Sequence, residues 1–131
     1  MKTTKINSIA DVAKLTKMKF AGCKKEKMYM LCLDGNMNVI NVSLIGDGDS
    51  HGVMVDKKSI LETAIRSSCE YCIVIHNHPN GVQTPSSDDI EAVCIIERIL
   101  NDIEVKLFDS IIVAGNVWVS IINDKKYKED D

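Results

Sequence analysis

A short apolar run, Tyr71–Ile75, ends directly where a polar loop begins at His76. Consecutive β-branched apolar residues without polar alternation are typical of a strand buried on both faces in the middle of a sheet. The loop contains two prolines and a glycine, and after it Ser86 precedes a segment whose apolar residues keep a helical period. A buried strand, a sharply turning loop and a helix in this order predict a sheet with a helix packed on it.

Four more elements are predicted before this strand. Ser8 fits the N-cap of an amphipathic helix over about residues 8–19. Met28–Leu33 and Val39–Ile45 are apolar runs separated by a Gly-containing turn, so they predict a β-hairpin. A second helix, capped by Asp56, would connect this hairpin to the buried strand.

The remaining segments are predicted from their polarity. Gly46–Gly52 alternates glycine with polar residues, and we expect no regular structure there. Val105–Val113 and Val117–Ile122 predict a second hairpin after the last helix. Residues 124–131 are mostly charged, and we expect them to form a C-terminal tail too polar to pack.

The order helix, two strands, helix, strand, helix, two strands favours an α/β (α+β) fold, in which helices lie against the faces of a mixed sheet. The chain has 131 residues, a common length for one domain, and a core of that size can be stable without disulfides. We therefore expect a single domain over residues 1–131, with its core at about 25–122.

Composition indicates where such a chain would work. Its longest apolar runs fall far below the roughly 20 residues that a membrane-spanning helix needs, and Met1–Lys19 lacks the pattern of an export signal. The five cysteines are an odd number, and Cys32, Cys72 and Cys94 sit in apolar runs, where a thiol behaves as a small hydrophobe. We expect a soluble protein of the reducing cytoplasm, with no membrane partner.

The charge balance bears on nucleic-acid binding. A net charge of −3 and a pI near 5.6 weigh against non-specific binding, which depends on clustered basic residues that release phosphate counterions. Several lysines do crowd together over residues 17–27, but such a run is more often a solvated face than a binding site. A nucleic-acid partner is therefore possible but has no support from the net charge.

The polar loop carries the residues most suited to chemistry. His76 and His78 are separated by one residue on an extended backbone, so both imidazoles project to the same side and can reach one ion at about 2.0–2.1 Å. A glycine and two prolines let the loop reverse, so Asp89 in the first turn of the next helix can supply a third ligand. Three protein ligands leave one zinc position open, which is typical of a catalytic site.

Simpler interpretations exist for each residue. Ser86 and Asp89 also have the spacing of a capping box at a helix start, and Ser86 can serve both purposes. A His-x-His pair alone is a weak signal for a metal, because a histidine after a strand is more often a hydrogen-bonded loop residue. The conjunction of all four residues at fixed spacing favours the metal.

His76-x-His78, seven intervening residues and then Ser86-x-x-Asp89 is the pattern that marks the JAMM (MPN+) metalloproteases, which this chain resembles. The surrounding residues, His-Asn-His-Pro-Asn-Gly and Thr-Pro-Ser, are most similar to its RadC-like JAB branch. The resemblance extends over about residues 25–121. It implies a curved mixed sheet between helices, of the JAB/MPN (cytidine-deaminase-like) kind, with one zinc ion at its rim.

The resemblance also implies a catalytic glutamate on the first strand, and by its position Glu26 matches it. Glu26 would be the general base toward the water, and Ser86 would donate a hydrogen bond to the developing oxyanion. The implied reaction is the hydrolysis of a peptide or isopeptide amide. Without the resemblance, a glutamate between two lysines would be interpreted as a surface charge.

The chain departs from the RadC-like pattern at two places. Lys57-Lys58-Ser59 replaces the usual Pro-Arg-Glu, and Phe108-Asp109-Ser110 replaces Leu-Asp-His. Contacts with a substrate or partner are expected to differ accordingly. The helix-hairpin-helix region that longer RadC proteins carry in association with DNA is not expected within this length, so a DNA-repair role transfers poorly.

Other interpretations stay open. Cys69-x-x-Cys72 has the spacing of a redox or second zinc site, but a dithiol normally opens a helix, whereas this pair lies between a helix end and a strand. His51 could approach the metal from the Gly-rich loop, and we assign it no role. The alternatives to a hydrolase are a catalytically silent metal-binding interaction module and a DNA-associated protein or nuclease using the same metal.

Overall fold

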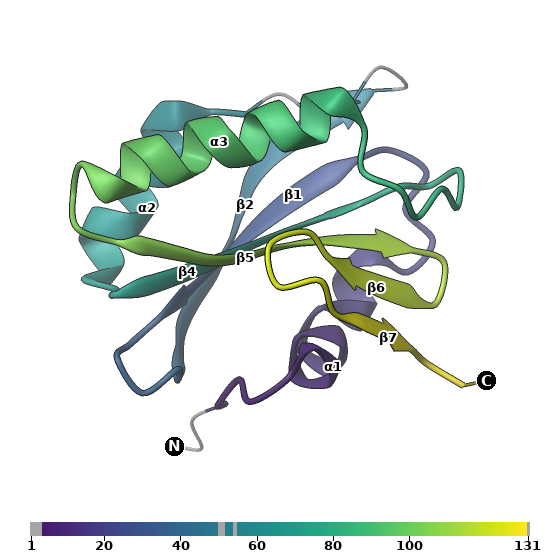
Figure 1. Cartoon of the computed structure of the whole chain (residues 1–131), viewed down its shortest axis with the longest axis horizontal. Coiled ribbons are helices and arrows are strands. Elements are labelled where there is room, and N and C mark those ends of the chain that lie inside the picture. Colours follow the sequence, from purple (N-terminus) through teal and green to yellow (C-terminus); the bar gives the residue numbers. More distant parts are fainter. Residues whose placement is uncertain (1–3, 50–51, 54, 131) are drawn as a thin grey trace.

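The computed structural model describes residues 4–49, 52–53 and 55–130. Within these residues, seven strands form one sheet in the order β3-β2-β1-β4-β5-β6-β7 (Figure 1). The strands are β1 Lys27–Leu33, β2 Val39–Asp49, β3 Gly52–Val53, β4 Tyr71–Asn77, β5 Lys106–Ala114, β6 Val117–Ser120 and β7 Lys126–Lys128. The helices are α1 Ile9–Phe20, α2 Lys57–Ser67 and α3 Ser87–Asn101.

Neighbouring strands are antiparallel except β4 and β5, which are parallel. The sheet is therefore mixed, and helices flank both of its faces (Figure 1). The α/β fold expected from the order of the elements is confirmed. None of the helices in the described residues has the length and apolar character needed to span a bilayer.

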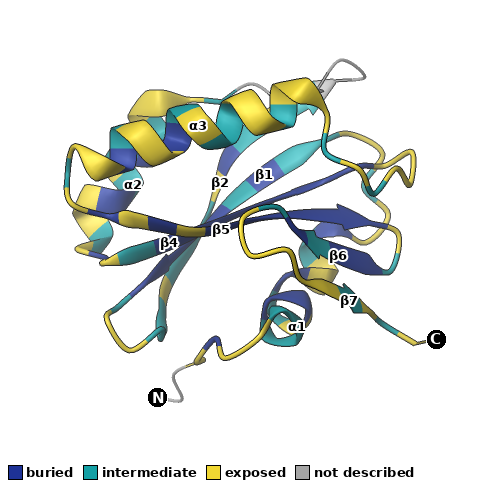
Figure 2. Ribbon diagram, in the orientation of Figure 1, coloured by how far each residue is buried: buried dark blue, intermediate teal, exposed yellow. Residues whose placement is uncertain are grey.

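The strand β4 lies at the centre of the fold and is buried on both faces (Figure 2). Cys72 and Val74 face a core cluster with α2 and α3, whereas Ile73 and Ile75 face a second cluster with α1. Both faces of the strand need apolar side chains, and this explains why its sequence does not alternate.

The helices begin where their capping residues predict. The Asp56 side chain accepts a hydrogen bond from the backbone N–H of Ser59 at 3.2 Å and so starts α2. Ser86 is the N-cap of α3, and Ser8 is the N-cap of α1, as expected. The N-terminal helix predicted at about 8–19 differs from α1 by one residue at each end.

Two expectations about polar segments are wrong. Residues 46–49, which we expected to be irregular, continue β2. Gly46 pairs with Met28 of β1, and Gly48 pairs with Val53 of β3. Strand pairing uses backbone groups, so it does not depend on the polarity of the side chains. The tail expected at 124–131 contains β7, which pairs with β6. Tyr127 packs against the core on one side while the lysines beside it reach solvent, and the backbone of the segment pairs with β6.

Candidate metal centre

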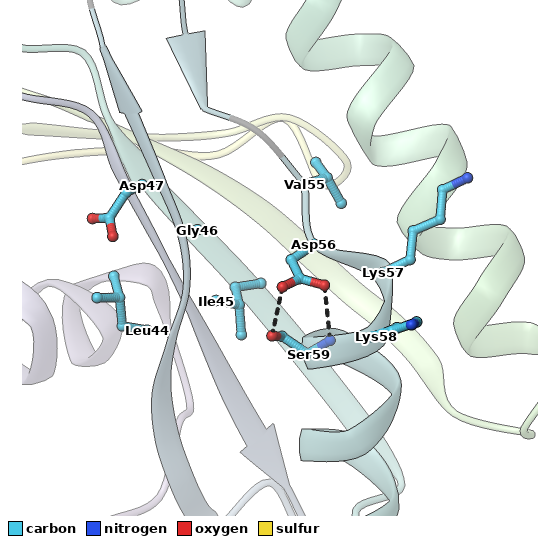
Figure 3. A pocket seen from close by; sticks show the side chains of 9 residues that line it. All are labelled: Leu44, Ile45, Gly46, Asp47, Val55, Asp56, Lys57, Lys58 and Ser59. Atoms are coloured by element: carbon cyan, nitrogen blue, oxygen red, sulfur yellow. Dashed lines mark hydrogen bonds between the residues drawn. The ribbon is translucent and has the colours of Figure 1, made fainter.

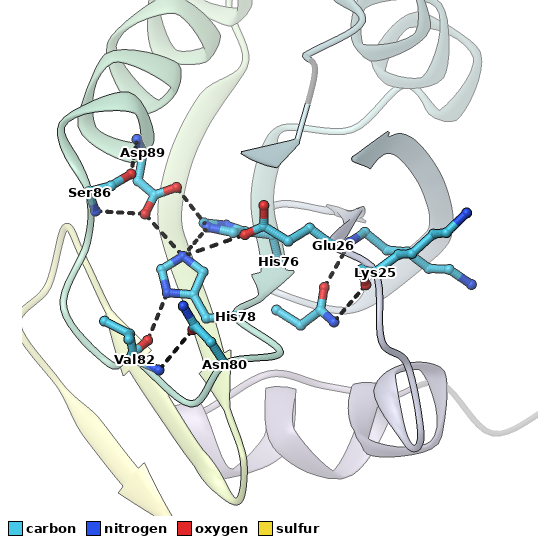
Figure 4. Close-up of polar contacts among 10 residues, drawn as sticks. Lys25, Glu26, His76, His78, Asn80, Val82, Ser86 and Asp89 are labelled. Atoms are coloured by element: carbon cyan, nitrogen blue, oxygen red, sulfur yellow. Dashed lines mark hydrogen bonds and ion pairs between the residues drawn. The ribbon is translucent and has the colours of Figure 1, made fainter. Parts of the chain in front are cut away.

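Three side chains that the sequence predicts as metal ligands converge at the end of β4 (Figure 4). The Nε2 atoms of His76 and His78 are 3.3 Å apart. One carboxylate oxygen of Asp89 lies 3.0 Å from Nε2 of His76, and the other lies 3.1 Å from Nε2 of His78. Both imidazoles are buried, and the carboxylate of Asp89 is 15% exposed, so the group sits at the rim of the fold.

The backbone explains this convergence. His78 extends the pairing of β4 with β5, because its N–H donates to the carbonyl oxygen of Val113 at 2.8 Å. The chain then turns, with the N–H of Gly81 bonded to the carbonyl oxygen of His78 at 2.9 Å and Gly81 at φ +81°, a conformation that favours glycine. This loop brings the first turn of α3, and with it Asp89, back over the two histidines.

The two imidazole rings are held differently. Nδ1 of His78 lies 2.7 Å from the carbonyl oxygen of Val82 and donates to it, which leaves the lone pair on Nε2 directed at the site. Nδ1 of His76 is buried and has no hydrogen-bond partner among the described residues. His78 therefore has the orientation typical of a metal ligand, and His76 is held through Nε2 and the surrounding core.

Asp89 provides the negative charge of the group. Burial acts to raise the pKa of this carboxyl, but hydrogen bonds from His76 and from the backbone N–H of Ser86 outweigh it and hold the pKa below its ordinary value. The carboxylate is therefore ionised at neutral pH. Two imidazole nitrogens and one carboxylate form a donor set that suits a divalent cation.

Glu26 stands at the edge of the same group, one residue before β1 (Figure 4). One of its carboxylate oxygens lies 3.9 Å from Nε2 of His78, and the side chain is 16% exposed. Glu26, His76 and His78 each offer a ligand atom within 4.8 Å of the others, so a glutamate that looks like a surface charge in the sequence faces the histidines. The shorter distances of Asp89 make it a closer third ligand than Glu26.

Asn77 is a functional candidate that the sequence reasoning missed. Its side chain accepts a hydrogen bond from the N–H of Lys27 at 2.7 Å and donates one to the carbonyl oxygen of Lys25 at 3.1 Å. These two bonds hold the backbone on both sides of Glu26, whose own carbonyl oxygen accepts from the N–H of Gly48 at 2.8 Å. Asn77 lies between the two histidines in sequence, so its hydrogen bonds fix the backbone on both sides of Glu26 relative to the histidines.

Ser86 caps α3 and contacts Asp89, as the spacing of the two residues predicts. Its hydroxyl oxygen accepts a hydrogen bond from the N–H of Asp89 at 3.1 Å, and its own N–H donates to Asp89 at 2.8 Å. The capping box is therefore present. Because a hydroxyl accepts with its lone pairs and donates through its proton, this cap leaves the O–H of Ser86 able to donate elsewhere.

The residues that depart from the RadC-like pattern lie outside this group. Lys57, Lys58 and Ser59 line a hollow of about 700 Å³ between β2 and the start of α2 (Figure 3). At the second departure Phe108 is 38% exposed and Ser110 is buried, whereas Asp109 keeps the aspartate of the pattern and accepts hydrogen bonds from the hydroxyl of Ser120 at 2.6 and 2.8 Å. His51 lies outside the described residues.

A second hollow, of about 340 Å³, is lined by His78 and Pro79, by Phe20 and Cys23, and by Trp118 of β6, among others. His78 is the one predicted site residue in this lining, and Phe20 and Trp118 belong to the core cluster that faces α1.

A family model described as the RadC-like JAB domain matches residues 6–127, which include all five predicted site residues. The chain belongs to the RadC-like JAB domain family. The match confirms the resemblance seen in the His-x-His and Ser-x-x-Asp pattern, and the mixed sheet with flanking helices is consistent with the fold of this family.

Relatives of the chain include UPF0758 proteins of three bacteria. The one from Finegoldia magna is 28% identical over 92% of this chain and 54% of its own length. The protein of Staphylococcus haemolyticus is 28% identical over 92% and 53%, and that of Clostridium perfringens is 30% identical over 89% and 52%. The chain thus spans about half the length of the curated relatives it matches.

Proposed function

We propose that this RadC-like JAB domain is a zinc-dependent amide hydrolase whose ligands are His76, His78 and Asp89. The observation that carries the proposal is the spacing of the donor atoms. Zinc bonds of about 2.0–2.2 Å in a tetrahedral arrangement hold two donor atoms about 3.3–3.4 Å apart. The pairs formed by the two Nε2 atoms and the carboxylate oxygens of Asp89 are 3.0–3.3 Å apart, so one ion fits among them with small adjustments.

The proposed chemistry divides between the ion and the protein. When bound, zinc would lower the pKa of a water molecule to about 7 and polarise the carbonyl group of the substrate. Glu26 accepts a proton from the attacking water, whose oxygen adds to the carbonyl carbon. The carboxylic acid then returns that proton to the amine nitrogen as the carbon–nitrogen bond breaks. A carboxylate oxygen of Glu26 lies 3.9 Å from Nε2 of His78, which places the proposed base beside the proposed ligands.

Ser86 completes the proposed mechanism. Its O–H donates to the carbonyl oxygen of the substrate while negative charge develops there. Because Ser86 is fixed as the N-cap of α3, its hydroxyl needs little reorganisation to make this bond. On the other side of the site, the hydrogen bonds between Asn77 and the backbone of Lys25 and Lys27 likewise reduce the reorganisation that Glu26 needs.

The proposed substrate is a peptide or protein, cleaved at a peptide or isopeptide bond. A nucleic-acid substrate has less support, because the net charge of −3 weighs against phosphate binding; Lys25 and Lys27, which flank Glu26, are the basic residues that such a substrate would contact. We expect the domain to work in the cytoplasm.

The test is amide hydrolysis by the purified, zinc-supplied chain on a panel of fluorogenic peptide and lysine-isopeptide substrates. Glu26→Gln should lower kcat by about 10²- to 10⁴-fold, the usual contribution of general acid–base catalysis. Zinc content and folding should be unchanged in this variant. Glu91→Gln, the same change at an exposed position of α3, is the matched control and should keep full activity.

Equal activity in Glu26→Gln and wild type would contradict the assigned base. Bound zinc without cleavage of any substrate in the panel would instead favour the metal-binding interaction module. Metal-dependent cleavage of DNA that disappears with His76→Ala would favour the nuclease.

A further inference from the structure

Three cysteines come together beneath α2, two from one Cys-x-x-Cys segment and one from a distant strand. Cys32 lies on β1, Cys69 follows the end of α2, and Cys72 lies near the start of β4. Cys32 and Cys72 are directly opposite each other in the antiparallel pairing of β1 with β4. The sulfur atoms of Cys69 and Cys72 are 3.6 Å apart, and all three sulfurs lie within 4.8 Å of one another.

These distances suit a shared ion. A metal–sulfur bond of about 2.3 Å in a tetrahedral arrangement places two sulfurs about 3.8 Å apart. The sulfurs of Cys69 and Cys72, 3.6 Å apart, are close to that separation, and no pair in the group exceeds 4.8 Å, so a shift of about 1 Å or less would close the site. Side-chain rotation of Cys69, which is attached to a loop rather than to a strand, can supply this shift.

The surroundings select the kind of ion. Cys32 and Cys72 are fully buried, and Cys69 is 7% exposed, so among the three cysteines an ion would reach Cys69 first. The rest of the cluster around them is apolar and includes Ile60 and Ala64 of α2. A donor set of thiols alone, closed off from water, is typical of structural sites for soft metal ions.

We propose that Cys32, Cys69 and Cys72 form a second metal site, which binds a soft thiophilic cation of the Zn²⁺ or Cu⁺ class and stabilises the fold. This proposal is independent of the proposed hydrolase. Cys72 and His76 are four residues apart on one strand, so the two sites lie about 13 Å from each other. The bound ion would join β1, β4 and the end of α2.

Metal binding at this cluster would be linked to pH, because a thiol must lose its proton to bind the cation as a thiolate.

The test uses a background in which the two cysteines outside the cluster are removed, Cys23→Ser with Cys94→Ser. This protein, prepared without air, is titrated with Cd²⁺ as a probe for the Zn²⁺ class and, separately, with Cu⁺. The thiolate-to-metal charge-transfer absorbance reports only sulfur ligands, so binding at the histidines does not contribute. We expect the absorbance to saturate at one ion per chain and the unfolding temperature to rise.

Cys69→Ala in the same background should weaken binding by at least about 100-fold, more than the usual 10- to 100-fold cost of losing an outer-shell partner. Cadmium NMR on the background protein counts the thiolate ligands without altering the cluster, and three are expected. A preference for Cd²⁺ or for Cu⁺ would assign the class of ion, and either supports the site. The proposed site would be overturned by any of four results. These are the absence of the charge-transfer band, unchanged binding in Cys69→Ala, fewer than three thiolate ligands, or a Cys69–Cys72 disulfide in the air-free protein.

Discussion

The two ends of β4 hold proposed metal ligands in different surroundings. At one end, His76, His78 and Asp89 combine nitrogen and oxygen donors at the rim of the sheet, next to a hollow. At the other end, Cys32 and Cys72 present sulfur donors within an apolar core cluster. The first group lies at the rim of the fold, with the Asp89 side chain 15% exposed, whereas Cys32 and Cys72 at the other end are fully buried.

Both groups offer three protein donors, so the proposed roles rest on donor type and burial. Nitrogen and oxygen donors at the rim of the fold suit a site that holds a water, whereas sulfur donors in an apolar core suit a structural site for a soft ion. Changes at the histidine end should therefore affect the reaction with little loss of stability. Changes at the cysteine end should affect stability and leave the reaction of the folded molecules unchanged.

The largest effect is expected from the pair of changes His76→Ala and His78→Ala. Loss of two of three ligands should remove about one zinc per chain and reduce hydrolysis to background, because no group remains to activate the water. Metal analysis and the peptide assay measure both effects. The charge-transfer band of the three cysteines is the internal control and should persist; its disappearance would mean that the two ends do not act separately.

Ser86→Ala should lower kcat by about 10²- to 10³-fold, the cost of losing one oxyanion donor, and lower the free energy of unfolding by about 1 kcal/mol through the lost cap. Ser86→Thr should recover both, because it keeps the hydroxyl. Asp56→Ala removes the cap of α2 and is the matched control: it should lose stability by a similar amount with kcat unchanged. If the two alanine variants had the same kcat, Ser86 would be only a cap.

Asn77→Ala should lower kcat by about 10- to 100-fold while KM and zinc content stay the same, because a misplaced Glu26 acts on proton transfer and not on binding. Asn101→Ala, an exposed position at the end of α3, is the control. Steady-state kinetics separate kcat from KM. A rise in KM alone would contradict the role assigned to Asn77, which is to position Glu26.

The smallest effect on the reaction is expected from Cys72→Ser. Placing a hydroxyl in an apolar core costs about 1–3 kcal/mol of unfolding free energy, as denaturant titration would measure. The kcat per folded molecule should not change. A loss of kcat comparable to that of Asn77→Ala would show that the cysteine end supports the reaction, contrary to the separation of the two ends.

The sequence predicts what depends on local spacing. His76 and His78 are joined through one residue, and Ser86 with Asp89 begins a helix, so their convergence follows from the strand, loop and helix that contain them. The capping residues Ser8 and Asp56 were predictable for the same reason, because a cap acts within one helical turn.

What the sequence did not predict depends on contacts between distant segments. Cys69-x-x-Cys72 is visible as a motif, but Cys32 joins it only through the register of β1 with β4. Asn77 reaches the backbone of Lys25 and Lys27 through the same pairing. In β7, Tyr127 packs on β6, and no local signal predicts a strand in a segment that is otherwise charged.

The central claim is that one zinc ion binds among His76, His78 and Asp89. A crystal structure of the zinc-supplied chain, with anomalous difference maps recorded on both sides of the zinc absorption edge, tests it most directly. The account predicts a peak about 2.0–2.1 Å from both Nε2 atoms and in contact with the Asp89 carboxylate. A well-ordered site without a zinc peak at this position would contradict the account and leave a capped loop with two hydrogen-bonded histidines.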